Sequence, residues 1–338
     1  MGQAMASSQF YLYGRSHFTA TGWEKARVKY PTPDPLDIAN LAGRVFVVTG
    51  ANSGLGKEIS SYLSQKGGKV YMVCRSEQRA AAAKTEIVEQ SKVDPNNLVP
   101  LQGDCGLKGD VVRISKEILE REPAGVHGLV CNAGALLNTR TMTPEGFETT
   151  FACHLAFGSY LLSKLLVPGL RKVGGQGKVL FVSSGGMYNT KLPSWRSLTC
   201  SDEVANKYDG TMAYAYCKRA QVLLAEQLAE AESSVPPAEK ITYVTAHPGW
   251  SSTPGVDAAF GDQSKWLQPM RTPWQGAEGM CWMMIADSKE LEAGAFYLDR
   301  APQTKHIAGP FFSEGSYTKN APKDVSDMMG KLAEVAGV

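Results

Sequence analysis

Short apolar runs alternate with amphipathic stretches from residue 44 to about residue 300. Such runs predict strands that are buried on both faces of a parallel sheet, and the stretches between them predict the helices that cover it. The predicted strands cover 44–49, 69–74, 98–102, 126–131, 177–183, 240–246 and 295–298. The predicted helices cover 54–66, 77–91, 107–122, 144–172, 210–232 and 275–286. The alternation predicts an α/β fold in a single domain, with a doubly wound, Rossmann-like sheet of about seven strands.

The ends of the chain do not follow this pattern. We expect an N-terminal aromatic and basic extension over 1–40, a catalytic domain over 41–312 and a C-terminal tail over 313–338. The aromatic residues of the extension would pack on the domain or on a second subunit, contact a membrane surface, or belong to a mobile segment. Within the domain, Thr143 before Pro144 predicts the N-cap and first residue of the long helix 144–172.

Two predicted loops, 185–210 and 249–272, are longer than ordinary connections. Each follows a predicted strand at its carboxyl end, where open α/β sheets bind ligands. The second loop either covers an apolar substrate or fills its own small core. Its large apolar residues are Trp250, Phe260, Trp266, Leu267, Met270 and Trp274.

The first predicted strand ends in a glycine-rich turn. Gly50, Gly54 and Gly56 follow Thr49 with the spacing Gly-x-x-x-Gly-x-Gly, and a predicted helix begins at Gly54. Glycines let a backbone turn tightly and approach a pyrophosphate, whose charge is stabilised by the free N–H groups at a helix start. The turn therefore predicts a nucleotide-binding site, with a plain tight connection as the alternative.

The predicted helix at 210–232 begins with a tyrosine and a lysine four residues apart, Tyr214 and Lys218. This spacing places both on one helix face, about 5–6 Å apart at Cβ. A phenol titrates near 10, and an adjacent ammonium favours the phenolate, so the pair suits acid–base catalysis near neutral pH. By itself the spacing is also common on solvated helices.

Two serines, Ser183 and Ser184, end the strand 177–183, where a hydroxyl can hydrogen-bond a substrate carbonyl. Serine followed by two glycines is also ordinary turn chemistry. The Gly-x-Ser-x-Gly pattern of serine hydrolases is absent around both serines. His247 could act as a base, but no acid partner for it is identifiable.

Composition narrows the function classes. The 338 residues carry 35 Lys and Arg against 33 Asp and Glu, so no broad basic surface is expected to bind nucleic acid. Seven scattered cysteines without Cys-x-x-Cys spacing indicate reduced thiols and no metal site. No apolar stretch approaches about 18 residues and no signal peptide is apparent. We expect a cytoplasmic protein, with peripheral membrane or organelle association as the alternative.

In combination, these motifs resemble the short-chain dehydrogenase/reductase superfamily. The resemblance extends over nearly all of the chain and fades after about residue 310. Within the superfamily, the chain is most similar to one subgroup that includes plant proteins. The segments that carry this similarity are Ser183–Tyr188, Tyr208–Tyr214 and His247–Val256. The superfamily motifs present, in order, are Thr49-Gly-x-x-x-Gly-x-Gly56, Asn132-Ala-Gly134, Ser184, Tyr214-x-x-x-Lys218 and Pro248-Gly249.

The resemblance implies a role for each matched residue. Tyr214 donates a proton to the developing alkoxide, Lys218 lowers the pKa of Tyr214 and holds the nicotinamide ribose, and Ser184 orients the carbonyl. Asp104 meets the adenine, and Thr253 bonds the carboxamide or pyrophosphate. The residues implied to bind the cofactor are Gly50, Asn52, Ser53, Gly54, Leu55, Gly56, Arg75, Asp104, Asn132, Gly134, Tyr214, Lys218, Pro248, Gly249 and Thr253.

Charge at the end of the second strand favours NADP(H) as the cofactor. NAD-binding folds place an acidic residue there for the ribose 2′-hydroxyl, whereas a 2′-phosphate needs a cation. This chain has Arg75 at that position, with Arg79 one turn further on, and a guanidinium can bind phosphate with two hydrogen bonds.

One residue departs from the family pattern. Relatives usually have an Asn in a stretch resembling Phe-Ala-x-Asn-x-Leu-Gly, whose amide supports a water chain from the active-site lysine. Here Phe151–Gly158 places His154 at that point and has one more residue before the glycine. His154 either carries protons in place of the amide, because its pKa lies near neutral, or packs as a neutral core histidine.

The sequence therefore predicts an NADP(H)-dependent oxidoreductase that interconverts a carbonyl and an alcohol on a small, lipophilic substrate. The alternatives are a non-catalytic NADP(H)-binding regulatory or assembly subunit and a double-bond reductase similar to protochlorophyllide reductases. Helices near 144–172 and 210–232 form a dimer interface in many relatives, so the resemblance also implies a homodimer.

Overall fold

A parallel sheet forms the centre of the protein in this computed structural model, which describes residues 2–256, 265–307 and 314–338. Strands β1 to β7 pair in parallel, and β8 adds an antiparallel edge, in the order β3-β2-β1-β4-β5-β6-β7-β8. The order reverses at β1, with β2 on one side and β4 on the other. The strands are β1 (Val45–Thr49), β2 (Lys69–Cys74), β3 (Leu98–Gln102), β4 (Gly128–Cys131), β5 (Gly177–Val182), β6 (Ile241–Ala246), β7 (Phe296–Leu298) and β8 (Ala301–Gln303).

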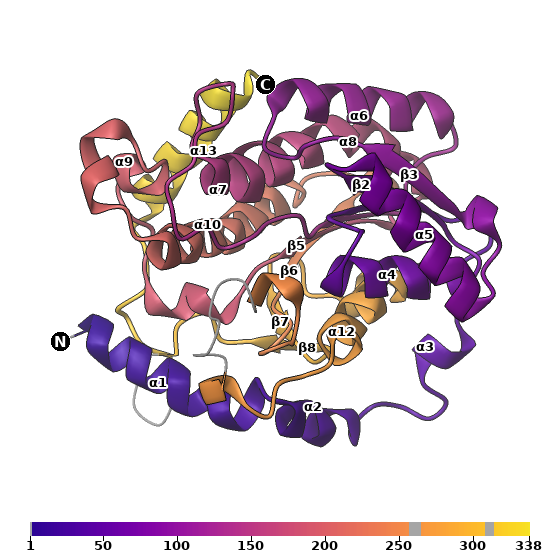
Figure 1. The fold of residues 1–338 in the computed structure, drawn as a ribbon, viewed down its shortest axis with the longest axis horizontal. Helices are drawn as coiled ribbons and strands as arrows, with labels where there is room; N and C mark the ends of the chain where they lie inside the picture. Colours follow the sequence, from indigo (N-terminus) through magenta and orange to yellow (C-terminus); the bar gives the residue numbers. More distant parts are fainter. Residues whose placement is uncertain (1, 257–264, 308–313) are drawn as a thin grey trace.

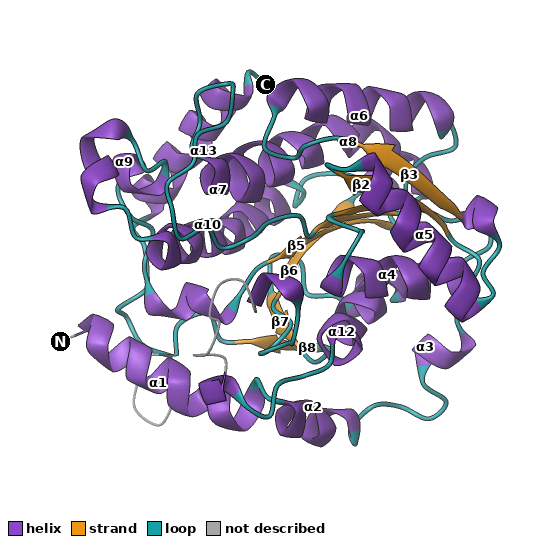
Figure 2. Cartoon of the chain, viewed as in Figure 1, coloured by secondary structure: helices purple, strands orange, loops and turns teal. Residues whose placement is uncertain are grey.

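Helices cover both faces of this sheet (Figures 1 and 2). The side chains of β1 alternate between the two faces, because successive residues of a strand point in opposite directions. Val45 and Val47 pack into the core under α6, α8 and α10, whereas Phe46 and Val48 pack under α4, α5 and α12. These helices are α4 (Gly54–Gln65), α5 (Glu77–Ser91), α6 (Lys108–Arg121), α8 (Leu162–Leu170), α10 (Gly210–Ala231) and α12 (Pro273–Ile285).

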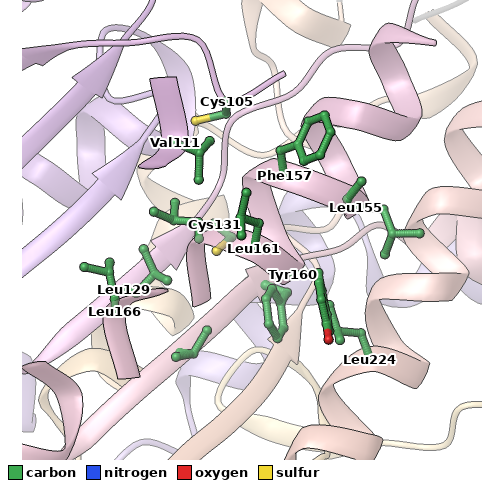
Figure 3. Packing of buried hydrophobic residues seen from close by; sticks show 14 of the residues in the cluster. Cys105, Val111, Leu129, Cys131, Leu155, Phe157, Tyr160, Leu161, Leu166 and Leu224 are labelled. Carbon is green, nitrogen blue, oxygen red and sulfur yellow. The ribbon is translucent and has the colours of Figure 1, made fainter. Parts of the chain in front are cut away.

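The predicted doubly wound fold and its seven strands are confirmed. The eighth strand, β8, was not predicted, and it contains Pro302. Proline lacks the N–H that a central strand needs, so an edge strand is where it fits. The core beneath α6 and α8 contains aliphatic, aromatic and cysteine side chains in close contact (Figure 3). Apolar packing on both faces therefore explains the continuous apolar runs of the sequence.

The long helix predicted at 144–172 begins later than expected. Glu148 is the N-cap and accepts a hydrogen bond from the Phe151 N–H, so the start predicted at Thr143 and Pro144 is wrong. Thr143 instead closes a turn, in which its hydroxyl accepts from the Phe147 N–H. The helix then runs through α7 (Thr149–Phe151), the π-helical segment η2 (Ala152–Leu161) and α8.

This helix is also long and apolar enough, over Thr149–Val173, to meet the criteria for a membrane span. However, 78% of its apolar window is buried inside the protein. It is the central helix of the core shown in Figure 3, where its side chains pack against the sheet.

The N-terminal extension is helical and packs on the catalytic domain. Helix α1 (Gly2–His17) lies beside the turn η4 (Gly185–Asn189) that follows β5. Phe18 is fully buried, and its ring contacts those of Phe10 and Trp250 at centroid distances of 5.7 and 5.8 Å. Two short helices complete the extension, α2 (Ala20–Arg27) and α3 (Pro35–Ile38).

A buried arginine holds the end of α1 in place. Arg271 is 1% exposed and donates to the carbonyl oxygens of His17 (2.8 Å), Phe18 (3.0 Å) and Thr19 (3.2 Å). Both of its terminal nitrogens bind the Asp299 carboxylate. Residues more than 250 positions apart are therefore joined by one side chain.

The tryptophans of the second long loop do not form a common cover. Trp250 packs on α1, Trp274 lies in α12 with its ring 5.7 Å from that of Tyr62, and Trp266 is 62% exposed. Phe260, which also belongs to that expectation, lies outside the described residues.

The C-terminal segment ends in an amphipathic helix, α13 (Pro322–Ala336), which was not predicted. Val325, Met328, Leu332 and Ala336 recur at helical spacing and are buried in the core that contains η2. Helix α13 therefore covers part of the helix layer through which the resemblance implies a dimer (Figure 1).

Candidate active site

The glycine turn joins β1 to α4 at the carboxyl end of the sheet, next to the point where the strand order reverses. Gly50 and Gly54 have φ values of +64° and +53°, which favour glycine. A Cβ on Gly56 would lie 2.4 Å from the carbonyl oxygen of Gly50. The close approach of α4 to the turn therefore requires glycine at the third position of the motif.

The start of α4 is arranged to receive an anion. Its N-cap, Ser53, makes no side-chain hydrogen bond to the helix, so the first N–H groups lack a side-chain cap. Thr253 lies opposite these N–H groups. A Cβ added to Gly54 would be 3.4 Å from the Thr253 side chain. The start of α4 and Thr253, both predicted to contact the pyrophosphate, thus lie on two facing segments.

Thr49 and Asn132 hold the ends of β1 and β4 together. The Thr49 hydroxyl donates to the Val130 carbonyl and accepts from the N–H groups of Asn132 (3.0 Å) and Ala133 (2.9 Å). The Asn132 amide donates in return to the Thr49 carbonyl at 2.9 Å. These bonds fix the Asn132–Gly134 segment beside the glycine turn.

On the predicted adenosine side, Arg75 follows β2 and is exposed. No ion pair engages Arg75 or Arg79 among the residues that the structure describes. Asp104 is half-buried, and its carboxylate accepts from the Gly106 N–H at 2.8 Å. Arg75 is therefore free to bind an anionic ligand at the end of β2.

Ser184 and Tyr214 meet at the end of β5. The Ser184 hydroxyl accepts from the Gly186 N–H (3.2 Å) and is hydrogen-bonded to the Tyr214 phenol. Burial raises the pKa of Tyr214 to about 12, and the bond from Ser184 only partly offsets this rise. The phenol is therefore protonated at neutral pH. Ser183, by contrast, points away and donates to the Lys218 carbonyl.

Lys218 is buried below Tyr214, with its Nζ 5.3 Å from the centre of the tyrosine ring. The Nζ donates to the carbonyl oxygen of Val182 at 2.6 Å and to the amide oxygen of Gln221 at 3.1 Å. Burial lowers the pKa of Lys218 to about 8. The predicted tyrosine–lysine pair is thus present on one face of α10, with Lys218 buried and Tyr214 partly exposed.

His154 packs edge-on against Tyr214, with ring centroids 5.3 Å apart. Its Nε2 lies 3.1 Å from the Ala135 carbonyl, which can only accept, so this nitrogen carries the proton. Burial, assisted by Lys218, holds the pKa of His154 well below its usual value. A Cβ on Gly134 would lie 1.9 Å from the ring, so the glycine leaves room for the histidine.

The extra residue in the His154 stretch has a structural counterpart. The segment η2 is π-helical over Ala152–Leu161, and a π-helix takes more residues per turn than an α-helix. This wider turn accommodates the additional residue before Gly158. The local sequence departure thus changes the helix geometry directly beside the candidate site.

His247 does not face the site. Its ring stacks on Phe296 at 5.3 Å and contacts the edge of Phe18, and its Nδ1 accepts from the Gly249 N–H. Burial lowers its pKa to about 3. His247 is therefore a neutral core residue that shapes the Pro248–Gly249 turn, and a role as a base is not supported.

Sequence reasoning did not identify Gln221 or the contribution of α1. Gln221 is three residues after Lys218, a spacing that places both on one helix face, so this signal was available. Phe10 comes within 2.8 Å of a Cβ built on Gly185, next to Ser184. No local pattern relates α1 to that turn.

The fold and this arrangement are those of a dinucleotide-dependent oxidoreductase: a glycine turn at the point where strand order reverses shares the carboxyl edge of the sheet with a serine, to which a tyrosine and a lysine are joined. The comparisons give the family. A model of short chain dehydrogenases matches residues 44–194. Dehydrogenase/reductase SDR family member 12 of Bos taurus is 33% identical over 332 residues, covering 98% of this chain and 97% of that protein. The chain belongs to the short-chain dehydrogenase/reductase superfamily of NAD(P)-dependent oxidoreductases.

Two further similarities extend the comparison. Retinol dehydrogenase 12 of Homo sapiens is 33% identical over 264 residues, covering 77% of this chain and 78% of that protein. A crystal structure of a protein described as a short-chain dehydrogenase from Escherichia coli CFT073, complexed with NADPH, has a TM-score of 0.59 and 20% identity, covering 77% of this chain and 98% of the other. The similarity to the Bos taurus protein extends beyond residue 310, where the resemblance was expected to fade.

Proposed function

We propose that this protein is an NADP(H)-dependent oxidoreductase that interconverts a carbonyl and an alcohol on a small lipophilic substrate. The observation that carries the proposal is the meeting of Ser184, Tyr214 and Lys218 at the end of β5. The neighbouring strands β4 and β1 end in the Asn132 segment and the glycine turn. A carbonyl at Ser184 would thus lie near a dinucleotide bound along the same edge of the sheet.

The cofactor residues would be those of the glycine turn, the Asn132 segment, Thr253 and Lys218. The cofactor supplies or accepts the hydride. Exposed Arg75 would bind the 2′-phosphate of NADP(H), because it has no competing ion pair in the described part of the chain. The NADPH complex of the Escherichia coli protein supports the same choice.

Tyr214 would act as the general acid in carbonyl reduction and as the base in the reverse direction. Because its pKa in this buried site is about 12, the phenol holds its proton at neutral pH and can deliver it to a developing alkoxide. The charged Lys218 would favour the phenolate that results. Ser184, already hydrogen-bonded to Tyr214, would hold the carbonyl oxygen within reach of that proton.

A lipophilic substrate is supported by the segment over the start of α10. Leu136 and Leu137 are half-buried there, and the Leu137 carbonyl accepts from the Tyr208 hydroxyl at 3.2 Å. The similarity to a retinol dehydrogenase points to the same substrate class. The Trp-rich loop, with Trp250 packed on α1, supports it less than the sequence suggested.

The second candidate is a non-catalytic NADP(H)-binding regulatory or assembly subunit. It is favoured by one observation: His154, at the position where the resemblance implies an amide, is a buried, neutral residue packed against Tyr214. A third reading, reduction of a carbon–carbon double bond, has no specific support in the site. The two leading candidates differ in whether any carbonyl is turned over.

The test is turnover of a panel of apolar aldehydes and ketones with NADPH, together with a titration of NADPH and NADH. Tyr214→Phe should lower kcat by about 10²–10⁴-fold while NADPH affinity stays close to that of the wild type. Tyr216→Phe, two residues along the same helix, is the matched control. Unchanged turnover in Tyr214→Phe would refute the mechanism, and NADPH binding without any turnover would support the regulatory subunit.

We also propose that the N-terminal helix contacts an intracellular membrane surface. Tyr11, Leu12 and Trp266 are exposed by 37%, 61% and 62%, and Arg15 donates to the Trp266 carbonyl beside them. Aromatic and basic residues of this kind favour the membrane–water interface. Sedimentation with anionic vesicles should be reduced by Leu12→Ser with Trp266→Ser, and equal sedimentation of the variant would contradict the proposal.

A further inference from the structure

The Lys218 ammonium is held by Gln221, a residue that is not among the predicted site residues. Gln221 is 1% exposed, and its amide oxygen accepts from the Lys218 Nζ at 3.1 Å. Its amide nitrogen donates to the His154 carbonyl at 2.8 Å and to the Ser159 hydroxyl at 2.9 Å. Gln221 therefore bridges the lysine on α10 and the π-helical segment η2.

The orientation of this amide follows from the chemistry of its partners. An ammonium can only donate, so it must face the amide oxygen, and a backbone carbonyl can only accept, so it must face the amide nitrogen. The Ser159 hydroxyl also donates to the His154 carbonyl at 2.6 Å, which fixes its role as acceptor toward Gln221. Each hydrogen-bonding group of the bridge thus has a partner of the right kind.

The groups around Lys218 explain why its charge depends on this bridge. The titratable groups around it are Tyr214 and Cys217 on α10, His154 and Cys153 on η2, and Cys131 at the end of β4. Burial raises the pKa values of the thiols and phenol and lowers that of His154, so all five are neutral at pH 7. None of these five groups is a carboxylate, and the ammonium is stabilised mainly by neutral oxygens.

We propose that Gln221 is a positioning residue that holds the Lys218 ammonium with its amide oxygen and anchors it to η2 with its amide nitrogen. The inference rests on the proposed function for its catalytic meaning, whereas the hydrogen bond itself is independent of turnover. Removing the amide oxygen of Gln221 makes the charged form of Lys218 less stable. Replacing the amide by a carboxylate makes that charged form more stable.

The experiment follows the protonation of Lys218 directly. Protein labelled with ¹³C in its lysine side chains is titrated by NMR, and Lys218→Met assigns the resonance. Gln221→Met, which keeps the chain length and removes both hydrogen-bonding groups, should lower the pKa of Lys218 by about one unit. Gln221→Glu should raise it. The pH at which carbonyl reduction declines on the alkaline side should move in the same two directions.

Matched variants separate this effect from a general loss of structure. Gln227→Met makes the same change at an exposed position of α10 and should leave the pKa of Lys218 unaltered. Ser159→Ala removes the far partner of the amide, disturbs η2 and leaves the Lys218 contact in place, so the pKa should again stay the same. If Gln221→Met does not fold, Gln221→Asn, which is too short to reach the lysine, should lower the pKa as Met would.

The outcomes distinguish this proposal from the proposed function. An unchanged Lys218 pKa in both Gln221→Met and Gln221→Glu, or a shift in the same direction in both, overturns the positioning role even if the enzyme is active. Opposite shifts support it even if no carbonyl in the panel is reduced. That second result, with NADPH bound but not oxidised, would refute the proposed function alone.

Discussion

The proposed cofactor side and the proposed carbonyl side of the site are held in place by different kinds of contact. On the cofactor side, Thr49 and Asn132 join neighbouring strands through hydrogen bonds at the ends of β1 and β4. On the carbonyl side, Arg271 joins Asp299 to backbone carbonyls at residues 17–19. The first side depends on a motif within one sheet edge, whereas the second depends on segments from opposite ends of the chain.

This difference shows where the chain departs from a minimal dinucleotide-binding fold. The turn η4 beside Ser184 has α1 as a neighbour, and the Phe10 ring of α1 reaches Gly185 in that turn. The two sides should therefore fail separately: variants on the carbonyl side should affect stability and substrate binding, and variants in the glycine turn should affect the cofactor.

The largest effect is expected for Arg271→Leu. The substitution leaves the Asp299 carboxylate, whose side chain is only 10% exposed, without its partner, and it removes three bonds to the backbone at residues 17–19. Losing one partner of a buried ion pair typically costs about 3–5 kcal/mol of unfolding free energy. Denaturant unfolding measures it. Arg196→Leu, which breaks the exposed pair with Glu203, should cost less than about 1 kcal/mol. Equal losses in the two variants would mean that Arg271 does not anchor α1.

Gly56→Ala should disrupt the glycine turn and weaken cofactor binding. The new Cβ would lie 2.4 Å from the Gly50 carbonyl oxygen, so α4 or the turn must shift. We expect NADPH affinity to fall on the order of 100-fold, or about 2.7 kcal/mol. Gly330→Ala, with no atom within 4 Å of its Cβ in α13, is the control and should leave NADPH affinity unchanged. Tight NADPH binding by Gly56→Ala would mean that the turn is not the pyrophosphate site.

The same division explains what the sequence could predict. Strands and most helices of the sheet follow from local periodicity, and Tyr214 and Lys218 from a four-residue spacing. The helix start at Glu148 was missed because Thr143 and Pro144 form a similar local pattern in a turn. The roles of Arg271 and of α1 could not be predicted, because they depend on contacts between distant segments, 253 positions apart for Arg271 and Phe18. The amphipathic pattern of α13 is local, since its buried residues recur at helical spacing in the sequence.

Acid should destabilise the protein through His247, whose ring packs against Phe18 directly after α1. Burial lowers its pKa from 6.5 to about 3, so between these values the unfolded chain binds a proton that the folded ring excludes. The unfolding free energy therefore falls as pH drops from about 6.5, by roughly 1–2 kcal/mol at pH 5 for this group. His247→Phe should make the decline between pH 7 and pH 5 shallower in denaturant unfolding. His154 and His306 have lowered pKa values as well, so part of the decline should remain. An identical slope in His247→Phe would contradict the assignment.

The smallest effect is expected for Phe10→Leu. The change keeps an apolar side chain against Gly185 but removes aromatic contacts with Phe18 and Trp250, which are worth about 0.5–1.5 kcal/mol in similar pairs. Leu12→Ala, at an exposed position of the same helix, should stay within about 0.5 kcal/mol of the wild type. Since η4 lies beside Ser184, Phe10→Leu should also raise KM for the carbonyl substrate while NADPH affinity is unchanged. A change in NADPH affinity instead would contradict the separation of the carbonyl side from the glycine turn.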